Sequence, residues 1–111
     1  MARTQSLGDF EQLVLLAILR LGSDAYGVSI RTELETKAGR STSSGALYTT
    51  LERLEDKGFV SFRVGDPSPT RGGRAKRHYR VTVAGRKAVT QSQVAYQKLL
   101  EGLNILSQAH E

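Results

Sequence analysis

Hydrophobic and polar positions follow a helical period over the first half of the chain. The apolar-rich stretch over about Asp9–Leu21 predicts a first helix, with Asp9 and Gln12 at the spacing of a capping box and Gly22 as its stop. Its apolar residues cover more than one face, which is typical of a helix that is buried on more than one side. We expect one side to meet the domain core and another, with Phe10 and Leu13, to meet a second subunit.

A second helix is predicted over about Tyr26–Ala38, where apolar residues recur every four positions. Asp24 is its candidate cap, and Gly39 follows as its stop. The repeat places a single apolar stripe on this helix. We therefore expect it to pack against the core with one face only.

The third predicted helix follows after a short polar turn. Ser43 is a good cap for a helix over about Ser44–Lys57 that stops at Gly58. Three leucines are expected to point inward while polar residues face outward: Leu47, Leu51 and Leu54. Two helices joined by about four residues, the second weakly apolar on its outer side, indicate a helix-turn-helix.

The apolar period then changes from helical to two. Val60, Phe62 and Val64 alternate with Ser61 and Arg63, which predicts one strand, and Tyr79, Val81 and Val83 alternate with Arg80 and Thr82, which predicts a second. The connection from Gly65 to Arg77 is long for a hairpin, and loops of that length are usually functional or disordered. A hairpin directly after a helix-turn-helix is the outline of a winged helix, with this loop as its wing.

A last helix is predicted over about Val83–Gln108, with Thr82 as its cap. A heptad seam with one polar position runs along it: Val89, Ser92, Tyr96, Leu99, Leu103 and Leu106. This helix would be about 39 Å long, more than the rest of the domain can cover, so we expect a helix of a second copy against it.

The predicted fold is therefore mainly α with a small β-hairpin. A winged helix-turn-helix over residues 1–82 is followed by a C-terminal dimerisation helix over residues 83–111, and the two form one structural unit. The chain of 111 residues is long enough for one core but not for two.

Composition then narrows the function. The chain has a formal net charge of +5, so an acidic partner is expected, with nucleic acid first and an anionic membrane surface second. The longest apolar run, Leu13–Leu19, is far too short for a membrane span. The first residues lack the apolar stretch of a signal peptide, and there is no cysteine, so we expect a cytoplasmic protein.

The basic residues are concentrated in one segment. Five of them and no acidic residue lie from Arg71 to Arg80. A solvated loop is the common explanation of such a run, but in a wing these residues favour phosphate contact. The two histidines, His78 and His110, give no catalytic pair, and Gly72-Gly73 lacks the remainder of a phosphate loop. We predict no enzymatic activity, no cofactor and no metal.

Particular segments resemble the PadR-like transcriptional regulators, specifically the short class with a single C-terminal helix. They run from Gly45-Ala46-Leu47-Tyr48 through Leu51-Glu52-Arg53-Leu54-Glu55 to Lys57-Gly58-Phe59-Val60, and continue in Arg77-His78-Tyr79-Arg80-Val81-Thr82. The resemblance implies a homodimeric repressor that binds double-stranded DNA and is released by a small aromatic effector. Two features depart from many relatives. Thr49 replaces a proline, and the chain lacks the tryptophan on which some members stack drugs.

The candidate DNA-binding residues fall into two groups. The first lies at the start and on the outer face of the third helix: Ser43, Ser44, Gly45, Tyr48, Thr49 and Arg53. Free amides and the helix dipole favour phosphate at the helix start, and Arg53 either pairs with helix acids or meets DNA. The second group lies in the wing: Arg74, Lys76 and Arg77. The alternative is a winged-helix module that binds RNA or a protein without reading a DNA sequence. An effector is expected between the first and last helices.

Overall fold

The structure of the protein is a computed structural model that describes residues 6–65 and 76–104. Over these residues the elements follow in the order α1 (Asp9–Leu21), the 3-10 turn η1 (Gly22–Asp24), α2 (Gly27–Ala38), α3 (Ser44–Asp56), β1 (Val60–Val64), β2 (Arg77–Val81) and α4 (Val83–Leu100). The two strands pair antiparallel, with Val60 opposite Val81 and Val64 opposite Arg77. The predicted winged helix-turn-helix with an added C-terminal helix is confirmed.

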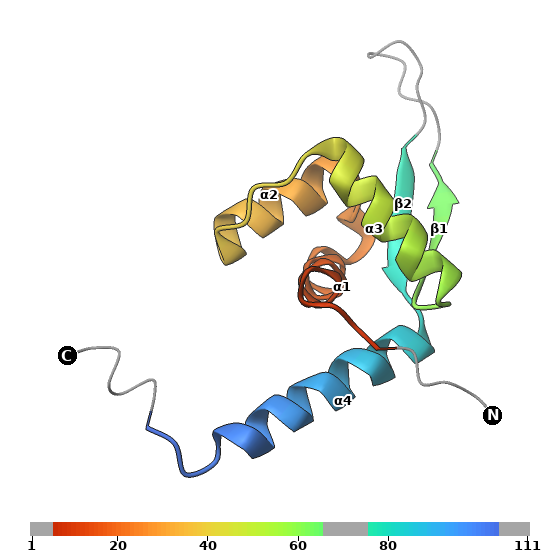
Figure 1. The fold of residues 1–111 in the computed structure, drawn as a ribbon. Coiled ribbons are helices and arrows are strands. Elements are labelled where there is room, and N and C mark those ends of the chain that lie inside the picture. The colour runs from red at the N-terminus through yellow and green to blue at the C-terminus, as the bar shows by residue number, and fades with distance from the viewer. Residues whose placement is uncertain (1–5, 66–75, 105–111) are drawn as a thin grey trace.

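Helix α1 lies in the middle of the fold, with α2 and α3 on one side and α4 on the other (Figure 1). Four of its apolar residues are buried: Val14, Leu15, Ala17 and Ile18. They pack against Ile30 and Leu34 of α2, the three inward leucines of α3, and Tyr79 of β2. This central position accounts for the apolar residues on several faces of α1, because most of them are covered within the monomer.

Two helix caps differ from the sequence expectation. The N-cap of α1 is Gly8, whose N–H donates to the Glu11 carboxylate at 2.8 Å, so Asp9 and Gln12 do not form a capping box. Asp9 is already inside the first turn, and the Gln12 amide oxygen instead accepts a hydrogen bond from Gln93. Likewise Tyr26, not Asp24, is the N-cap of α2, with its N–H bonded to Ser29 Oγ at 3.0 Å.

The caps of α3 and α4 are confirmed. Ser43 Oγ accepts from the N–H of Ala46 at 3.0 Å, and Thr82 Oγ1 accepts from the N–H of Gly85 at 3.1 Å. Strand β2 accordingly ends before Thr82, and Val83 belongs to α4.

Helix α4 ends at Leu100 and not near Gln108. Gly102 takes a positive φ of 80°, and the N–H of Leu103 turns back to the carbonyl of Leu100 at 2.9 Å. The helix is therefore about 27 Å long instead of about 39 Å. Leu103 lies beyond its end, and Leu106 lies outside the described residues.

The segment at the C-terminal end of α3 forms hydrogen bonds both with the residue that caps α4 and with the N-terminal part of α1. On the α4 side, the Thr82 hydroxyl donates to the Gly58 carbonyl at 2.6 Å, and the Thr82 N–H donates to the Phe59 carbonyl at 3.0 Å. On the α1 side, Lys57 Nζ contacts the buried Glu11 carboxylate at 2.9 Å and the Ser6 carbonyl at 2.8 Å. These contacts fix the orientation of α3 relative to the rest of the fold.

Candidate nucleic-acid interface

Helix α3 presents an open polar face. Its three inward leucines are fully buried, as predicted, and Thr50 is buried beside them with its hydroxyl bonded to the Ala46 carbonyl. The outward residues are exposed: Gly45, Tyr48, Thr49, Glu52, Arg53 and Asp56. No other part of the described chain covers this face, which leaves it free for a partner.

The start of α3 is exposed as well. Ser43, Ser44 and Gly45 all lie at the surface, and the first turn of the helix carries no acidic side chain. The Ser43 hydroxyl accepts from the backbone of the first turn, so it acts as the cap. The positive end of the helix dipole nevertheless remains turned to solvent, where an anion is favoured.

Tyr48 packs against the beginning of α2. Tyr48 is 40% exposed. Any residue other than glycine at position 27 would place its Cβ only 2.5 Å from the Tyr48 hydroxyl. Only glycine fits there without a shift of the tyrosine. The Tyr48 hydroxyl is therefore held beside the N-terminus of α2, a placement that no spacing in the sequence indicates.

Lys76, at the base of the wing, also lies near the N-terminus of α2. Lys76 Nζ lies 4.1 Å from the centroid of the Tyr26 ring, within the range of a cation–π contact. We name the four residues Tyr26, Gly27, Tyr48 and Lys76 the α2-cap cluster. No pattern in the sequence indicates this cluster, because its members come from three parts of the fold and Lys76 is 50 positions from Tyr26 along the chain.

His78 packs against the Tyr26 ring of this cluster. Its ring lies 5.6 Å from the Tyr26 ring, centroid to centroid, and its Nδ1 lies 3.1 Å from the Ser23 carbonyl oxygen. The side chain is half-buried, so His78 is a packing residue between η1 and the hairpin.

The remaining arginines differ in how firmly they are placed. The Arg77 guanidinium lies 4.5 Å from the centroid of the Phe62 ring, which orients it on the hairpin. Over residues 6–65 and 76–104 the ion pairs are Arg20 with Glu33 and Lys57 with Glu11, so Arg53 has no ion-pair partner there. Arg74 lies outside the described residues.

The buried carboxylate of Glu11 forms an ion pair with Lys57, next to the C-terminal end of α3. Burial alone would raise the pKa of Glu11, but the hydrogen bond from Gly8 and the Lys57 ammonium outweigh burial and hold this pKa below its usual value. Glu11 is thus ionised at neutral pH. The ion pair joins the N-terminus of α1 to the C-terminal end of α3.

The predicted partner-facing seam of α4 divides into two parts. Val89 is only 6% exposed and belongs to the core of its own chain, so its placement at a subunit interface was wrong. Further along, the apolar side chains emerge: Tyr96 is 50% exposed, Leu99 78% and Leu103 58%. On α1, Phe10 and Leu13 are half-buried. Between the two helices lies a groove of about 430 Å³ lined in part by Leu13, Leu16, Tyr96 and Leu100.

Comparison with known proteins decides the family. The sequence profile of the Transcriptional regulator PadR-like family matches residues 15–91. The chain belongs to the PadR-like family of transcriptional regulators. It is also 40% identical over 90 residues to the Transcriptional regulator Rv3488 of Mycobacterium tuberculosis, covering 78% of each chain.

Solved structures of PadR-like proteins share the fold. A PadR-like transcriptional regulator from Bacillus cereus superposes with a TM-score of 0.67 at 20% identity, over 89% of this chain and 91% of that one. PadR of Bacillus subtilis, solved in complex with operator DNA, gives 0.62 at 24% identity, over 75% of this chain and 46% of that one.

Membership of the PadR-like family identifies the protein as a regulator without enzymatic activity. In the part of the chain that the structure describes, His, Asp and Glu side chains nowhere gather in a group of three that would hold a metal ion. Nor does any helix there combine the length and the apolar character that a membrane crossing requires.

Proposed function

We propose that this PadR-family regulator binds double-stranded DNA in a sequence-specific manner, as a homodimeric repressor in the cytoplasm. The observation that carries the proposal is the uncovered outer face of α3, flanked at the α2-cap cluster by Lys76. A helix of this width fits the major groove of B-DNA, and a flanking cation suits the phosphates beside it. The operator complex of the Bacillus subtilis PadR supports the same partner.

Within this interface the residues divide into two tasks. Ser43, Ser44 and Gly45 approach phosphate at the start of α3, while Tyr48, Thr49 and Arg53 lie on the face that enters the groove. The wing residues Arg74, Lys76 and Arg77 contact the backbone or the adjacent minor groove. Phosphate contacts then supply affinity and salt dependence, and groove contacts supply sequence choice.

The second copy packs on α4 and α1. The exposed apolar residues Tyr96, Leu99 and Leu103, together with the half-buried Phe10 and Leu13 of α1, are the surface offered for dimerisation; Leu106 is proposed to extend it. Residues 1–82 thus serve as the reading unit and residues 83–111 as the dimerisation segment. A two-fold dimer predicts an operator with two half-sites about one helical turn apart.

A small aromatic effector would fit the groove between α1 and α4. Its lining includes the Tyr96 ring and the leucines that also border the dimer surface. An effector there would act by favouring one dimer geometry over another, which requires different affinities for the two.

The experiment is selection of genomic duplexes by the purified protein, followed by binding titrations on the best duplex and on a scrambled one. A sequence-specific regulator keeps a large preference for the selected duplex at physiological salt. Equal affinity for both duplexes, or tighter binding to RNA, would favour a winged-helix module that does not read DNA sequence.

Matched variants test the division of tasks. The double change Lys76→Ala and Arg77→Ala removes up to two phosphate contacts per subunit, so the log–log salt slope is expected to flatten by at most about 3.6. Thr49→Ala should leave the slope unchanged and cost roughly 1–3 kcal/mol at the base pair it faces. Lys98→Ala, an exposed lysine near the end of α4, is the control for a lost surface charge. If the wing variant loses sequence preference and Thr49→Ala loses only uniform affinity, the tasks are assigned the wrong way round.

A further inference from the structure

One line of residues runs along the outer face of α3, on the side away from the core. Its members recur at spacings of four, three and four positions, and we name them the outer line: Gly45, Thr49, Glu52 and Asp56. With 3.6 residues per turn, this spacing keeps them on one side of the helix. All four are exposed, while the inward leucines occupy the opposite side. The outer line is therefore the part of α3 that lies deepest in a DNA groove.

The charge changes along the outer line. Gly45 and Thr49 are uncharged, and the first turn of α3 carries no acidic side chain. Glu52 and Asp56 then bring two negative charges toward the end of the helix. Because the N-terminus of a helix is its positive end, the first half of α3 approaches phosphates more favourably than the second half. Glu52 is thus the acidic residue of the outer line that lies nearest to the end favoured by DNA.

Helix stability does not explain an acidic residue at position 52. A surface glutamate on a helix is stabilised by a basic residue three or four positions away. Those positions around Glu52 hold an aromatic residue, a hydroxyl residue and two acids: Tyr48, Thr49, Glu55 and Asp56. Arg53 is adjacent in sequence, and adjacent residues of a helix do not face each other. The two like charges make Glu52 unfavourable for the helix itself.

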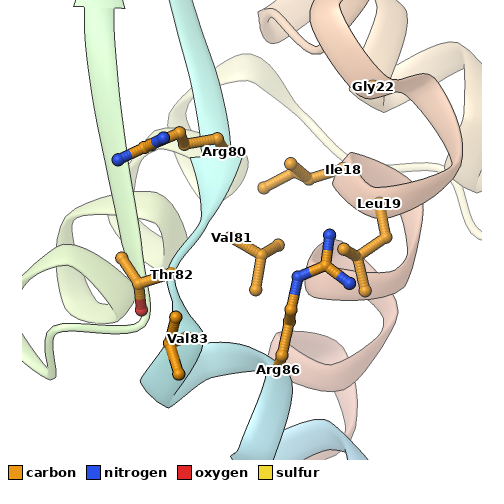
Figure 2. A pocket seen from close by; sticks show the side chains of 8 residues that line it. All are labelled: Ile18, Leu19, Gly22, Arg80, Val81, Thr82, Val83 and Arg86. Carbon is orange, nitrogen blue, oxygen red and sulfur yellow. The ribbon is translucent and has the colours of Figure 1, made fainter.

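Basic residues of the hairpin and of α4 point elsewhere. In Figure 2 the Arg80 guanidinium turns toward β1, where its Nε donates to Ser61 Oγ at 3.2 Å. Arg86 extends from α4 toward α1 in the same view. Lys57, which follows α3 directly, is paired with a carboxylate of α1. Neither of the ion pairs in the described part of the chain includes Glu52, so its carboxylate is open to a partner from outside the chain.

The chemistry of a carboxylate selects among the four bases. A carboxylate accepts hydrogen bonds and donates none. In the major groove only cytosine, through N4, and adenine, through N6, present a donor. Adenine places the acceptor N7 beside its donor, guanine presents two acceptors, and thymine presents an acceptor and a methyl group. Cytosine is therefore the base that a groove-facing glutamate favours.

We infer that Glu52 reads a cytosine in each operator half-site, by accepting a hydrogen bond from the N4 amino group of that base. The inference rests on the proposed DNA binding and adds to it the identity of one base pair. Thr49 and Glu52 are three residues apart, about 4.5 Å along the helix axis, and base pairs are about 3.4 Å apart. The cytosine is therefore expected within about two base pairs of the pair that Thr49 faces.

The test uses the full-length protein and the duplex obtained by selection from genomic DNA. Each base pair of the half-site is changed in turn to the other three, in both half-sites together, and binding is titrated at one fixed salt concentration. For the wild type we expect one cytosine at which any other base weakens binding about ten-fold or more per half-site. In Glu52→Ala this discrimination should fall to about two-fold, while the other positions keep theirs. Thr49→Ala, titrated on the same duplexes, locates the neighbouring pair.

Glu55→Ala is the matched control. Glu55 is also an exposed acidic residue of α3, but it lies off the outer line. Each substitution removes one negative charge, so both are expected to raise the affinity for every duplex by a similar small factor. Only Glu52→Ala should change the base preference. Because both side chains are exposed, both variants are expected to fold.

A base analogue tests the hydrogen-bonding atom itself. Pyrimidin-2-one in place of the identified cytosine keeps the ring but lacks the 4-amino group. Because the analogue also weakens the base pair, the loss of affinity in Glu52→Ala serves as the baseline, and the additional loss in the wild type measures the coupling between the two groups. This additional loss is expected to be about ten-fold per half-site.

Four results would overturn the inference. Two concern the base series: every preference of the wild type survives in Glu52→Ala, or Glu55→Ala changes the same preference equally. The third is an equal loss with the analogue in the wild type and in Glu52→Ala. The fourth is a Glu52-dependent pair farther from the Thr49-dependent pair than the expected distance. All four leave sequence-specific binding intact, whereas a wild type that binds selected and scrambled duplexes equally refutes the proposed function and this inference together.

Discussion

Replacing Gly85 with alanine is expected to destabilise the protein, although alanine is the better helix former. Gly85 is buried in the first turn of α4. A methyl group there would lie 2.7 Å from Val81 Cγ1 and still closer to the carbonyl oxygen of Phe59. Carbon atoms in contact are normally about 3.5–4.0 Å apart. Helix α4 therefore has to move away from the turn between α3 and β1.

The size of the effect follows from three contributions. Alanine gains about 1 kcal/mol over glycine inside a helix. Overpacking of a buried site costs about 1–3 kcal/mol. Moving α4 also weakens the two hydrogen bonds from Thr82 to Gly58 and Phe59, each of which contributes about 1 kcal/mol. The expected net loss in the free energy of unfolding is about 2 kcal/mol.

Urea unfolding at one fixed protein concentration measures this difference, since the stability of the proposed dimer would depend on concentration. Gly45→Ala is the matched control, because Gly45 is also helical but a Cβ there meets nothing within 4 Å. It should raise stability by up to about 1 kcal/mol. If Gly85→Ala proved as stable as the wild type while Gly45→Ala behaved as expected, the argument that α4 is tightly seated would be refuted.

Three further predictions concern other parts of the fold. Because the pKa of Glu11 is lowered in the folded state, its ion pair stabilises the protein at pH values above the ordinary glutamate pKa, and this stability is lost as the pH falls through the lowered value. Urea unfolding measured across that pH range should show a smaller loss of unfolding free energy in Glu11→Gln than in the wild type. An equal loss in both proteins would contradict the assignment. Ser43→Ala removes the cap of α3 and should lower the unfolding free energy by about 1 kcal/mol, a prediction that fails if the melting temperature is unchanged. The double change Leu99→Lys and Leu103→Lys places charges on the proposed dimer surface and should yield monomers in light scattering; an unaltered mass, dimeric or monomeric, would exclude this surface.

The sequence predicts the first three helices well because each carries apolar residues at helical spacing and is followed closely by a glycine. The three leucines of α3 fall at helical spacing and all point into the core. The cap residues were harder, since Asp9 and Asp24 have the right chemistry but Gly8 and Tyr26 occupy the required backbone conformation. Local residue type does not reveal which neighbour leaves the helical conformation first.

Helix α4 shows a different limit of pattern reading. A heptad seam indicates that an apolar stripe is covered, but it does not indicate which chain covers it. Val89 is covered by the core of its own chain. The pattern also continues across Gly102, where the backbone turns. The α2-cap cluster had no local signal at all, because Lys76 meets Tyr26 only once the hairpin has folded against α2.

The contact between Tyr48 and Gly27 restricts how this surface can diverge among descendants of the gene. A side chain at position 27 would displace the ring at position 48 from its present place, so a change at position 27 is expected to alter the placement of the Tyr48 hydroxyl. Thr49 and Glu52 carry no such restriction, because both are exposed on the outer face of α3. Under the proposed DNA binding, new sequence preferences are expected to arise at these two positions before the tyrosine–glycine pair changes.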